Sequence, residues 1–117
     1  VVEETEAIFY TQYIHHVNEI RINCYKNKVV SVYDKIDEGN GNFNFKYIKN
    51  AEKEIPDGIQ KWLDIICNKI GLEIYGLDVL ITEEGKYYLL EVNSAPILFP
   101  ITCNRIANLI KKDYFNA

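Results

Sequence analysis

Several features that would assign this chain to a class of protein are absent from its sequence. No run of about 18 apolar residues occurs, and the opening residues, VVEETEAIF, carry no basic segment ahead of an apolar one. The sequence therefore predicts neither a membrane span nor a signal peptide. A phosphate-binding loop of the form GxxxxGK[ST] is also missing, and the GNGN stretch at 39–42 precedes no helix start.

An excess of positive charge is likewise missing. With 13 basic and 17 acidic residues the formal net charge is -4, which argues against nucleic acid or an anionic membrane as the main partner. The three cysteines, Cys24, Cys67 and Cys103, are too few and too scattered for a disulfide framework or a zinc site. We expect buried free thiols, which indicate a reducing compartment and hence a cytoplasmic protein.

The residues that are present suit one globular domain over 1–117, with 48% hydrophobic and 26% charged residues. β-branched and aromatic residues predict a strand at 8–14 and two strands around a turn within 19–36. The polar stretch 37–50 predicts a loop, and a second strand pair occupies 76–96. With the two helices below, this order predicts an α+β fold: a largely antiparallel sheet with helices packed on one face.

Both predicted helices follow from apolar spacing and end signals. The first begins at Pro56–Asp57 and ends before Gly71. Its apolar side consists of Ile59, Trp62, Leu63, Ile66 and Ile70. The second runs from about Thr102 to Lys112, and its apolar side consists of Ile106, Leu109 and Ile110.

Three polar side chains interrupt the apolar strands of 76–96: Asp78, Glu91 and Asn93. With an even number of loop residues around Glu84–Gly85, Asp78 lies opposite Glu91, their side chains about 5 Å apart; an odd loop would separate them. Asn93 shares the face of Glu91, since alternate strand residues point the same way. Facing carboxylates repel, so the cluster predicts a Mg²⁺ or Mn²⁺ site. The alternative is a solvated face whose carboxylates neutralise nearby lysines.

The strand pair within 19–36 also has one polar face. A register that pairs Ile22 with Val32 keeps the apolar sides together and places Lys35 opposite Glu19 and next to Arg21. Two cations beside a metal site suit a phosphate or an acyl phosphate, to which arginine offers a bidentate fork. The alternative is a surface ion pair between Lys35 and Glu19, which contributes little.

Two segments together resemble a known family. GLEIYGLDVLITEEGKYYLLEVNSAP resembles the closing signature of the ATP-grasp superfamily: a glycine–hydrophobic–Asp strand, a turn, then Leu-Glu-Val-Asn-Ser-x-Pro. YTQYIHHVNEIRINCYKNKVVSVYDK is similar to the preceding segment of RimK-like and glutathione-synthetase-like carboxylate–amine ligases. The resemblance implies the C-terminal half of an ATP-grasp fold, as a fragment or a truncated paralogue, without the N-terminal domain and the ATP lid.

The resemblance also implies roles for particular residues. Mg²⁺ ions bridging the phosphates of ATP would bind to Asp78, Glu91 and Asn93, and Asn93 would also lie at the nucleotide. The residues at the transferred phosphoryl group would be Arg21 and Lys35. The hinge beside adenine would consist of Gln12, Tyr13 and Ile14. Such enzymes convert a carboxylate to an acyl phosphate, which an amine attacks to form an amide or peptide bond, with ADP and phosphate released.

The implied function is therefore the ATP- and magnesium-binding half of a ligase that acts on small-molecule or peptide carboxylates and amines, and that is inactive without its missing domain. Tyr13 replaces an acidic residue of the family pattern, and Ile97 stands where glycine is common. These departures and the missing lid leave an alternative open, a non-catalytic nucleotide-binding regulatory module. A plain α+β interaction domain without a metal is a third hypothesis.

Overall fold

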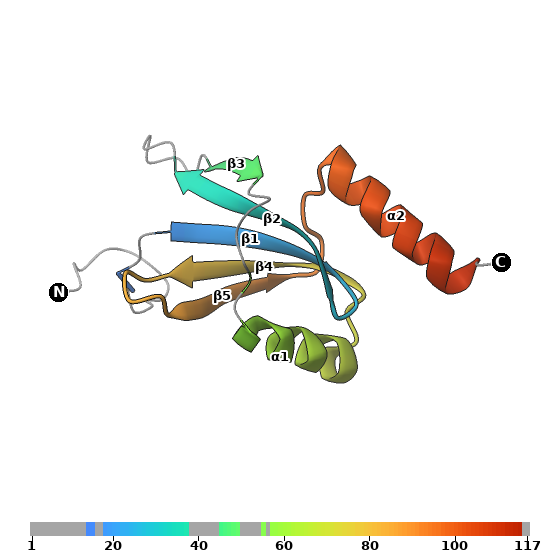
Figure 1. Ribbon diagram of the computed structural model, residues 1–117, viewed down its shortest axis with the longest axis horizontal. Coiled ribbons are helices and arrows are strands. Elements are labelled where there is room, and N and C mark those ends of the chain that lie inside the picture. The colour runs from blue at the N-terminus through green and yellow to red at the C-terminus, as the bar shows by residue number, and fades with distance from the viewer. Residues whose placement is uncertain (1–13, 16–17, 38–44, 50–54, 56, 116–117) are drawn as a thin grey trace, which may run out of the picture.

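One antiparallel sheet forms the framework of the protein (Figure 1). The computed structural model describes residues 14–15, 18–37, 45–49, 55 and 57–115. The sheet order is β3-β2-β1-β4-β5, and each neighbouring pair is antiparallel. The strands are β1 Asn18–Tyr25, β2 Lys28–Asp37, β3 Phe45–Lys49, β4 Ile74–Ile81 and β5 Tyr87–Asn93. The predicted α+β class and its antiparallel sheet are confirmed.

Strand β3 is the main difference from the predicted order of elements. It lies within the stretch 37–50 that was predicted as a loop, and it pairs with the edge of β2 from Tyr33↔Lys49 to Asp37↔Phe45. The glycines and asparagines before it in the sequence suggest a loop, and the β-prone segment itself has only five residues. Pairing with the edge of β2 supplies the hydrogen bonds that this short strand needs. The predicted strand 8–14 lies outside the described residues, except for Ile14.

The helices begin and end near their predicted positions. Helix α1, Asp57–Ile65, continues into a π-helical turn, η1, Ile66–Ile70. It ends at Gly71, whose φ of 81° is the left-handed conformation that glycine adopts without strain. The second helix, α2, runs Pro100–Tyr114, one turn longer than predicted. The expected burial of Ile70 is wrong: it is 61% exposed, because the wider π turn rotates it away from the core.

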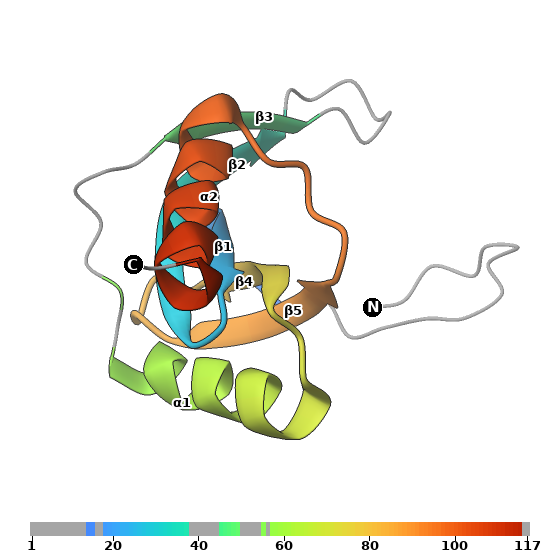
Figure 2. The ribbon, with the colours of Figure 1, turned by 90° about the vertical axis from the view of Figure 1, so that its right-hand side faces the viewer.

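The two helices cover opposite faces of the sheet, not one face as predicted (Figures 1 and 2). Alternate residues of a strand point to opposite sides. In β1 and β2, Ile22 and Val32 pack with α1 in one core cluster. The next residue of β2, Tyr33, bonds from the other side to Thr102 of α2. The sequence pattern identifies both apolar helix faces but not the side of the sheet that each covers.

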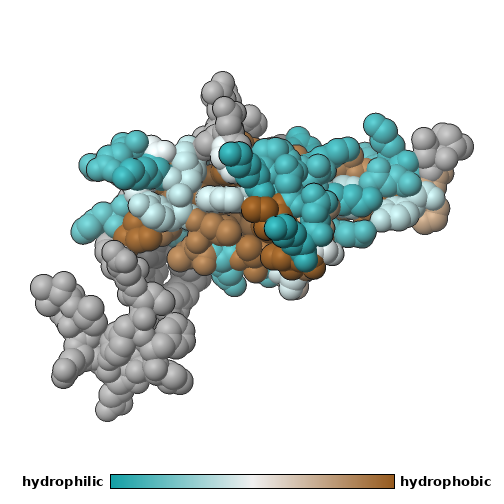
Figure 3. All heavy atoms as spheres, turned by 90° about the horizontal axis from the view of Figure 1, so that it is seen from below, coloured by the Kyte–Doolittle hydropathy of each residue, from teal (hydrophilic) through white to brown (hydrophobic). Residues whose placement is uncertain are grey.

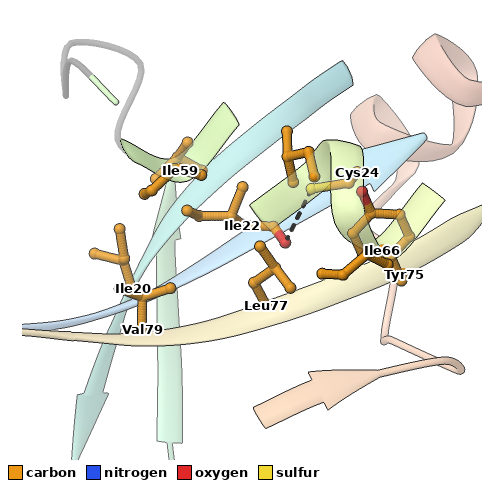
Figure 4. Close-up of a cluster of buried hydrophobic side chains, with 10 residues drawn as sticks. Ile20, Ile22, Cys24, Ile59, Ile66, Tyr75, Leu77 and Val79 are labelled. Atoms are coloured by element: carbon orange, nitrogen blue, oxygen red, sulfur yellow. Dashed lines mark hydrogen bonds between the residues drawn. The ribbon is translucent and has the colours of Figure 1, made fainter. Parts of the chain in front are cut away.

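The main core lies between the sheet and α1. Figure 4 shows apolar side chains of β1 and β4 pointing toward Ile59 and Ile66 of α1 and η1. Burial raises the pKa of the Cys24 thiol to about 12, and its Sγ lies 3.8 Å from the Ile22 carbonyl oxygen. Cys24 is therefore a buried thiol, as predicted. Cys103 is exposed and Cys67 is half-buried, so the prediction that all three are buried is wrong.

Apolar side chains also remain on the surface of α1 and β5. Leu90 is 59% exposed and Ile65 is 49% exposed. Figure 3, which views the molecule from the side on which α1 and β5 lie, shows apolar atoms gathered on that face. Patches of this kind are typical of surfaces that contact other protein segments. Within the described part of the chain, no helix is long and apolar enough to cross a membrane.

A polar cluster fastens the C-terminal end of α2 to the β1–β2 turn. Asp113 Oδ2 accepts hydrogen bonds from Tyr25 Oη at 2.9 Å and from Lys26 Nζ at 3.1 Å. Lys26 Nζ also lies 4.7 Å from the centre of the Tyr114 ring. The bonds from Tyr25 and Lys26 lower the pKa of the Asp113 carboxyl below its ordinary value.

This cluster gives α2 a pH-dependent contribution to stability. A lowered carboxyl pKa stabilises the fold above the group's ordinary pKa, and the contribution disappears as pH falls through the lowered value. At about pH 7 we expect the wild type to unfold a few degrees above Asp113→Asn. The difference between the two melting temperatures should become smaller as the pH is lowered to about 3. Circular-dichroism melts of both proteins measure it, and a gap that does not change with pH would contradict the assignment.

Candidate functional site

The β4–β5 hairpin brings the predicted carboxylates into register by an unexpected route. Thr82 pairs with Lys86, so the loop between them has three residues, not an even number. Gly85 adopts the left-handed φ of 79° that such a turn requires. Further along, Asp78 pairs with Glu91 but Val79 pairs with Leu89, which leaves Leu90 as a β-bulge.

The odd loop and the bulge cancel each other. Alone, an odd loop would turn Glu91 to the side opposite Asp78, and one extra residue in β5 turns it back. The predicted pairing of Asp78 with Glu91 is therefore confirmed, and the prediction of an even loop is wrong. Asn93, which pairs with Gly76, lies on the same face as Glu91. Strand parity thus places Asp78, Glu91 and Asn93 on one side of the sheet.

These three groups differ in exposure and in partners. Asp78 is 2% exposed, whereas Glu91 is exposed and has no ion-pair or hydrogen-bond partner among the described residues. Asn93 Oδ1 accepts a hydrogen bond from the Ala95 N–H at 2.9 Å, which leaves that oxygen one lone pair. Among the described residues, the face therefore carries one negative charge that no cation balances.

Arg21 occupies the centre of this polar face. It lies directly opposite Asp78 across β1 and β4. Its Nε donates to Asp78 Oδ1 at 2.7 Å, and a terminal nitrogen donates to Asp78 Oδ2 at 3.1 Å. The pair is bidentate and buried, with Arg21 7% exposed, and such charge-assisted geometry is strong. The sequence predicted both residues for one site but not this bond between them.

Gly76 makes room for the arginine side chain. A Cβ at this position would lie 3.0 Å from Arg21 Cδ, 3.1 Å from Pro96 Cβ and 3.4 Å from Asn23 Oδ1. Any larger residue would push the Arg21 stem or the loop after β5 out of place. Glycine is required here because other side chains pass over it.

Lys35 and Glu19 form the pair that their register predicts. Lys35 Nζ lies 3.0 Å from Glu19 Oε1, and the two side chains are only 11% and 15% exposed. The pair is more buried than the surface ion pair considered above. Glu19 lies two residues before Arg21 in β1, so the pair is on the same face as Arg21 and Lys35 is a second cation beside the site.

A buried polar network beside Arg21 was not predicted. Asn23 Nδ2 donates to Ser31 Oγ at 3.2 Å, and Ser31 Oγ lies 2.8 Å from Thr102 Oγ1. Thr102 Oγ1 in turn lies 3.2 Å from Tyr33 Oη. Among the described residues, Asn23 Oδ1 is the buried side-chain oxygen without a hydrogen-bond partner. The sequence signal was available, because Asn23, Ser31 and Tyr33 alternate with apolar residues, but it cannot show that α2 supplies the last member.

The donor set suits a hard divalent cation with outside ligands. The described residues contain no cluster of three or more carboxylate, imidazole or thiolate groups. A cation here would take two carboxylates and one amide oxygen, and oxygens of water or phosphate would complete its shell. Mg²⁺ is commonly bound in this way.

Of the predicted hinge residues, Gln12 and Tyr13 lie outside the described part of the chain, whereas Ile14 is half-buried.

Several solved structures that superpose on this fold are ligases or macrocyclases, among them the ATP-grasp ligase PsnB. The macrocyclase MdnB from Microcystis aeruginosa MRC superposes with a TM-score of 0.63 at 20% identity over 86% of this chain and 40% of that chain. MdnC from the same organism, bound with the precursor peptide MdnA, superposes with a TM-score of 0.62 at 19% identity. The match covers 86% of this chain and 35% of that chain. D-alanyl-alanine synthetase A from Vibrio cholerae superposes with a TM-score of 0.55 at 18% identity, over 82% of this chain and 34% of that chain. These likenesses establish the fold.

The sequence comparisons narrow the class to a family. The model of the RimK-like ATP-grasp domain matches residues 1–112, so the chain belongs to that family. D-alanine–D-alanine ligase from Pseudomonas putida GB-1 is 41% identical over 64 residues, which cover 46% of this chain and 20% of the relative. The ligase of Pseudomonas entomophila L48 matches equally. The chain therefore spans only a fifth of the curated relatives that it matches.

Proposed function

We propose that this chain is the metal- and nucleotide-binding part of an ATP-dependent carboxylate–amine ligase. Asp78, Glu91 and Asn93 would hold Mg²⁺ at the phosphates of ATP, and Arg21 and Lys35 would bind the transferred phosphoryl group. When bound, the cation would neutralise phosphate charge that develops in phosphoryl transfer. The residues of the chain contribute by positioning and charge stabilisation rather than by a protein nucleophile.

The single observation that best supports the proposal is the register of Asp78 with Glu91. A three-residue loop alone would separate the two carboxylates, and the bulge at Leu90 restores their pairing. Glu91 has no cation beside it among the described residues, so the face is left with the charge that a divalent metal would neutralise. A solvated face of unrelated carboxylates would not need this alignment.

Peptides are the substrate class that the structural neighbours favour. MdnC was solved with a precursor peptide, as was the ATP-grasp ligase PsnB, whereas the curated relatives are ligases of D-alanine. All three are named as ligases or macrocyclases. We propose a carboxylate of a peptide or amino acid as the group to be activated and an amine as the acceptor.

Glu91→Gln should weaken the binding of Mg²⁺-ADP about tenfold or more, because it removes the unpaired carboxylate of the face. Folding should be unaffected, since the Glu91 side chain is exposed and has no ion-pair or hydrogen-bond partner among the described residues. Isothermal titration of Mg²⁺-ADP into both proteins measures the change, and circular dichroism verifies that they are folded.

Glu84→Gln is the matched control. It makes the same change of charge in the same hairpin, but Glu84 lies in the exposed loop, where its carboxylate is 3.7 Å from Lys86 Nζ. Its affinity should stay within about twofold of the wild type. If both variants bound Mg²⁺-ADP equally weakly, the loss would come from the change in net charge and not from a site at Glu91. A folded wild type that gives no heat of binding would refute the proposed function.

A further inference from the structure

The metal ligand Asp78 is covered by Arg21 in this structure. Both carboxylate oxygens accept hydrogen bonds from the guanidinium, and Asp78 retains only 2% of its surface. A divalent cation needs open access to at least one of these oxygens, because it exchanges hydration waters for protein ligands. Resting on the proposed function, we expect the Arg21 guanidinium to move when the cation binds, because it covers both oxygens.

A second acceptor for the guanidinium lies beside the first. Asn23 follows Arg21 by two residues on the same face of β1, and it is 1% exposed. Its Oδ1 has no hydrogen-bond partner among the described residues. The bond from Asn23 Nδ2 to Ser31 Oγ directs this oxygen away from Ser31. An unpartnered buried acceptor is unfavourable unless it is used in another state.

Gly76 connects the two positions. Arg21 Cδ and Asn23 Oδ1 lie 3.0 Å and 3.4 Å from the point at which a Cβ of Gly76 would stand. The arginine stem and the free oxygen are therefore neighbours over a residue without a side chain. Gly76 itself places no side chain between them, and the third neighbour at this point is Pro96 Cβ at 3.1 Å, from the loop after β5.

We propose that Asn23 is a positioning residue that accepts the Arg21 guanidinium when a divalent cation takes Asp78. In the metal-free state Arg21 neutralises Asp78. In the metal-bound state the cation neutralises Asp78, and Asn23 Oδ1 holds Arg21 on the same face, where it is available to a phosphate oxygen. The hydroxyl chain through Ser31 and Thr102 fixes the orientation of the Asn23 amide.

Nitrogen-15 NMR of the wild-type chain tests the exchange directly. The Arg21 Nε–Hε resonance reports on the 2.7 Å bond to Asp78, and it should move on addition of Mg²⁺ without nucleotide. An unmoved resonance under conditions in which Mg²⁺ binds would overturn the inference, because Asp78 would then hold metal and arginine together. The proposed function would survive that result.

The Asn23→Val variant tests the second position. It keeps a branched side chain of similar width but has no acceptor, so a guanidinium that leaves Asp78 finds no hydrogen-bond acceptor at position 23. Mg²⁺ affinity should fall about tenfold. Ser31→Ala is the control: it breaks the network beside Asn23 but keeps the oxygen, and its affinity should stay within about threefold. Equal affinity of Asn23→Val and wild type would overturn the inference alone, whereas absence of Mg²⁺-ADP binding by the wild type would refute the proposed function with it.

Discussion

Asp78→Asn is expected to lower the free energy of unfolding by about 3 kcal/mol, because it leaves the buried Arg21 guanidinium without its counter-ion. The bidentate bond joins β1 to β4 at the middle of the sheet, where Arg21 is only 7% exposed and water replaces the lost carboxylate poorly. The same substitution removes a proposed metal ligand, and binding of Mg²⁺-ADP should be lost. Urea unfolding followed by circular dichroism measures the first effect, and titration calorimetry measures the second.

A double variant separates the two effects. In Arg21→Met/Asp78→Leu both charges are replaced by apolar groups of similar size, and such replacements of buried pairs are often neutral or stabilising. Most of the lost stability should return while binding remains absent. If stability and binding returned together, the ion pair would have a purely structural role, and the metal assignment at Asp78 would be wrong.

Leu77→Ala should cost about 3 kcal/mol of stability, in the usual range for deletion of a buried leucine side chain, and should leave the affinity for Mg²⁺-ADP unchanged. Leu77 adjoins Asp78 in β4 but points to the other side of the sheet, where it is fully buried in the core under α1. Trp62 of α1 packs against the same core, so its fluorescence reports the unfolding.

The value of Leu77→Ala lies in its contrast with Asp78→Asn. Two adjacent residues of one strand would lose similar stability, and only one of them would lose binding. The affinity is measured at a temperature at which both variants are folded. A large loss of affinity in the leucine variant would mean that binding follows stability in general, which would contradict a site confined to one face.

Strand parity accounts for much of what the sequence could predict. Alternation within a strand placed Glu91 with Asn93, and the register of β1 and β2 placed Lys35 opposite Glu19, as found. The loop length was wrong because a bulge at Leu90 carries no signal in the one-dimensional pattern. The predicted pairing of Asp78 with Glu91 is correct although the predicted loop is not, because the odd loop and the bulge offset each other.

Other features depend on tertiary contacts that a sequence pattern does not contain. The bond between Arg21 and Asp78 joins residues 57 positions apart in the chain. Thr102 completes a polar network begun in β1 only because α2 returns across the sheet. The π turn that exposes Ile70 replaces ordinary helical spacing over five residues. Local propensity fixes none of these.

The bulge at Leu90 makes the β4–β5 hairpin tolerant of a deletion at that one position. Without Leu90, Glu91 would follow Leu89 directly and continue the regular ladder, so it would still pair with Asp78. Deletion of Leu90 should therefore leave the two carboxylates aligned, and a relative with the same three-residue loop can lack the bulge.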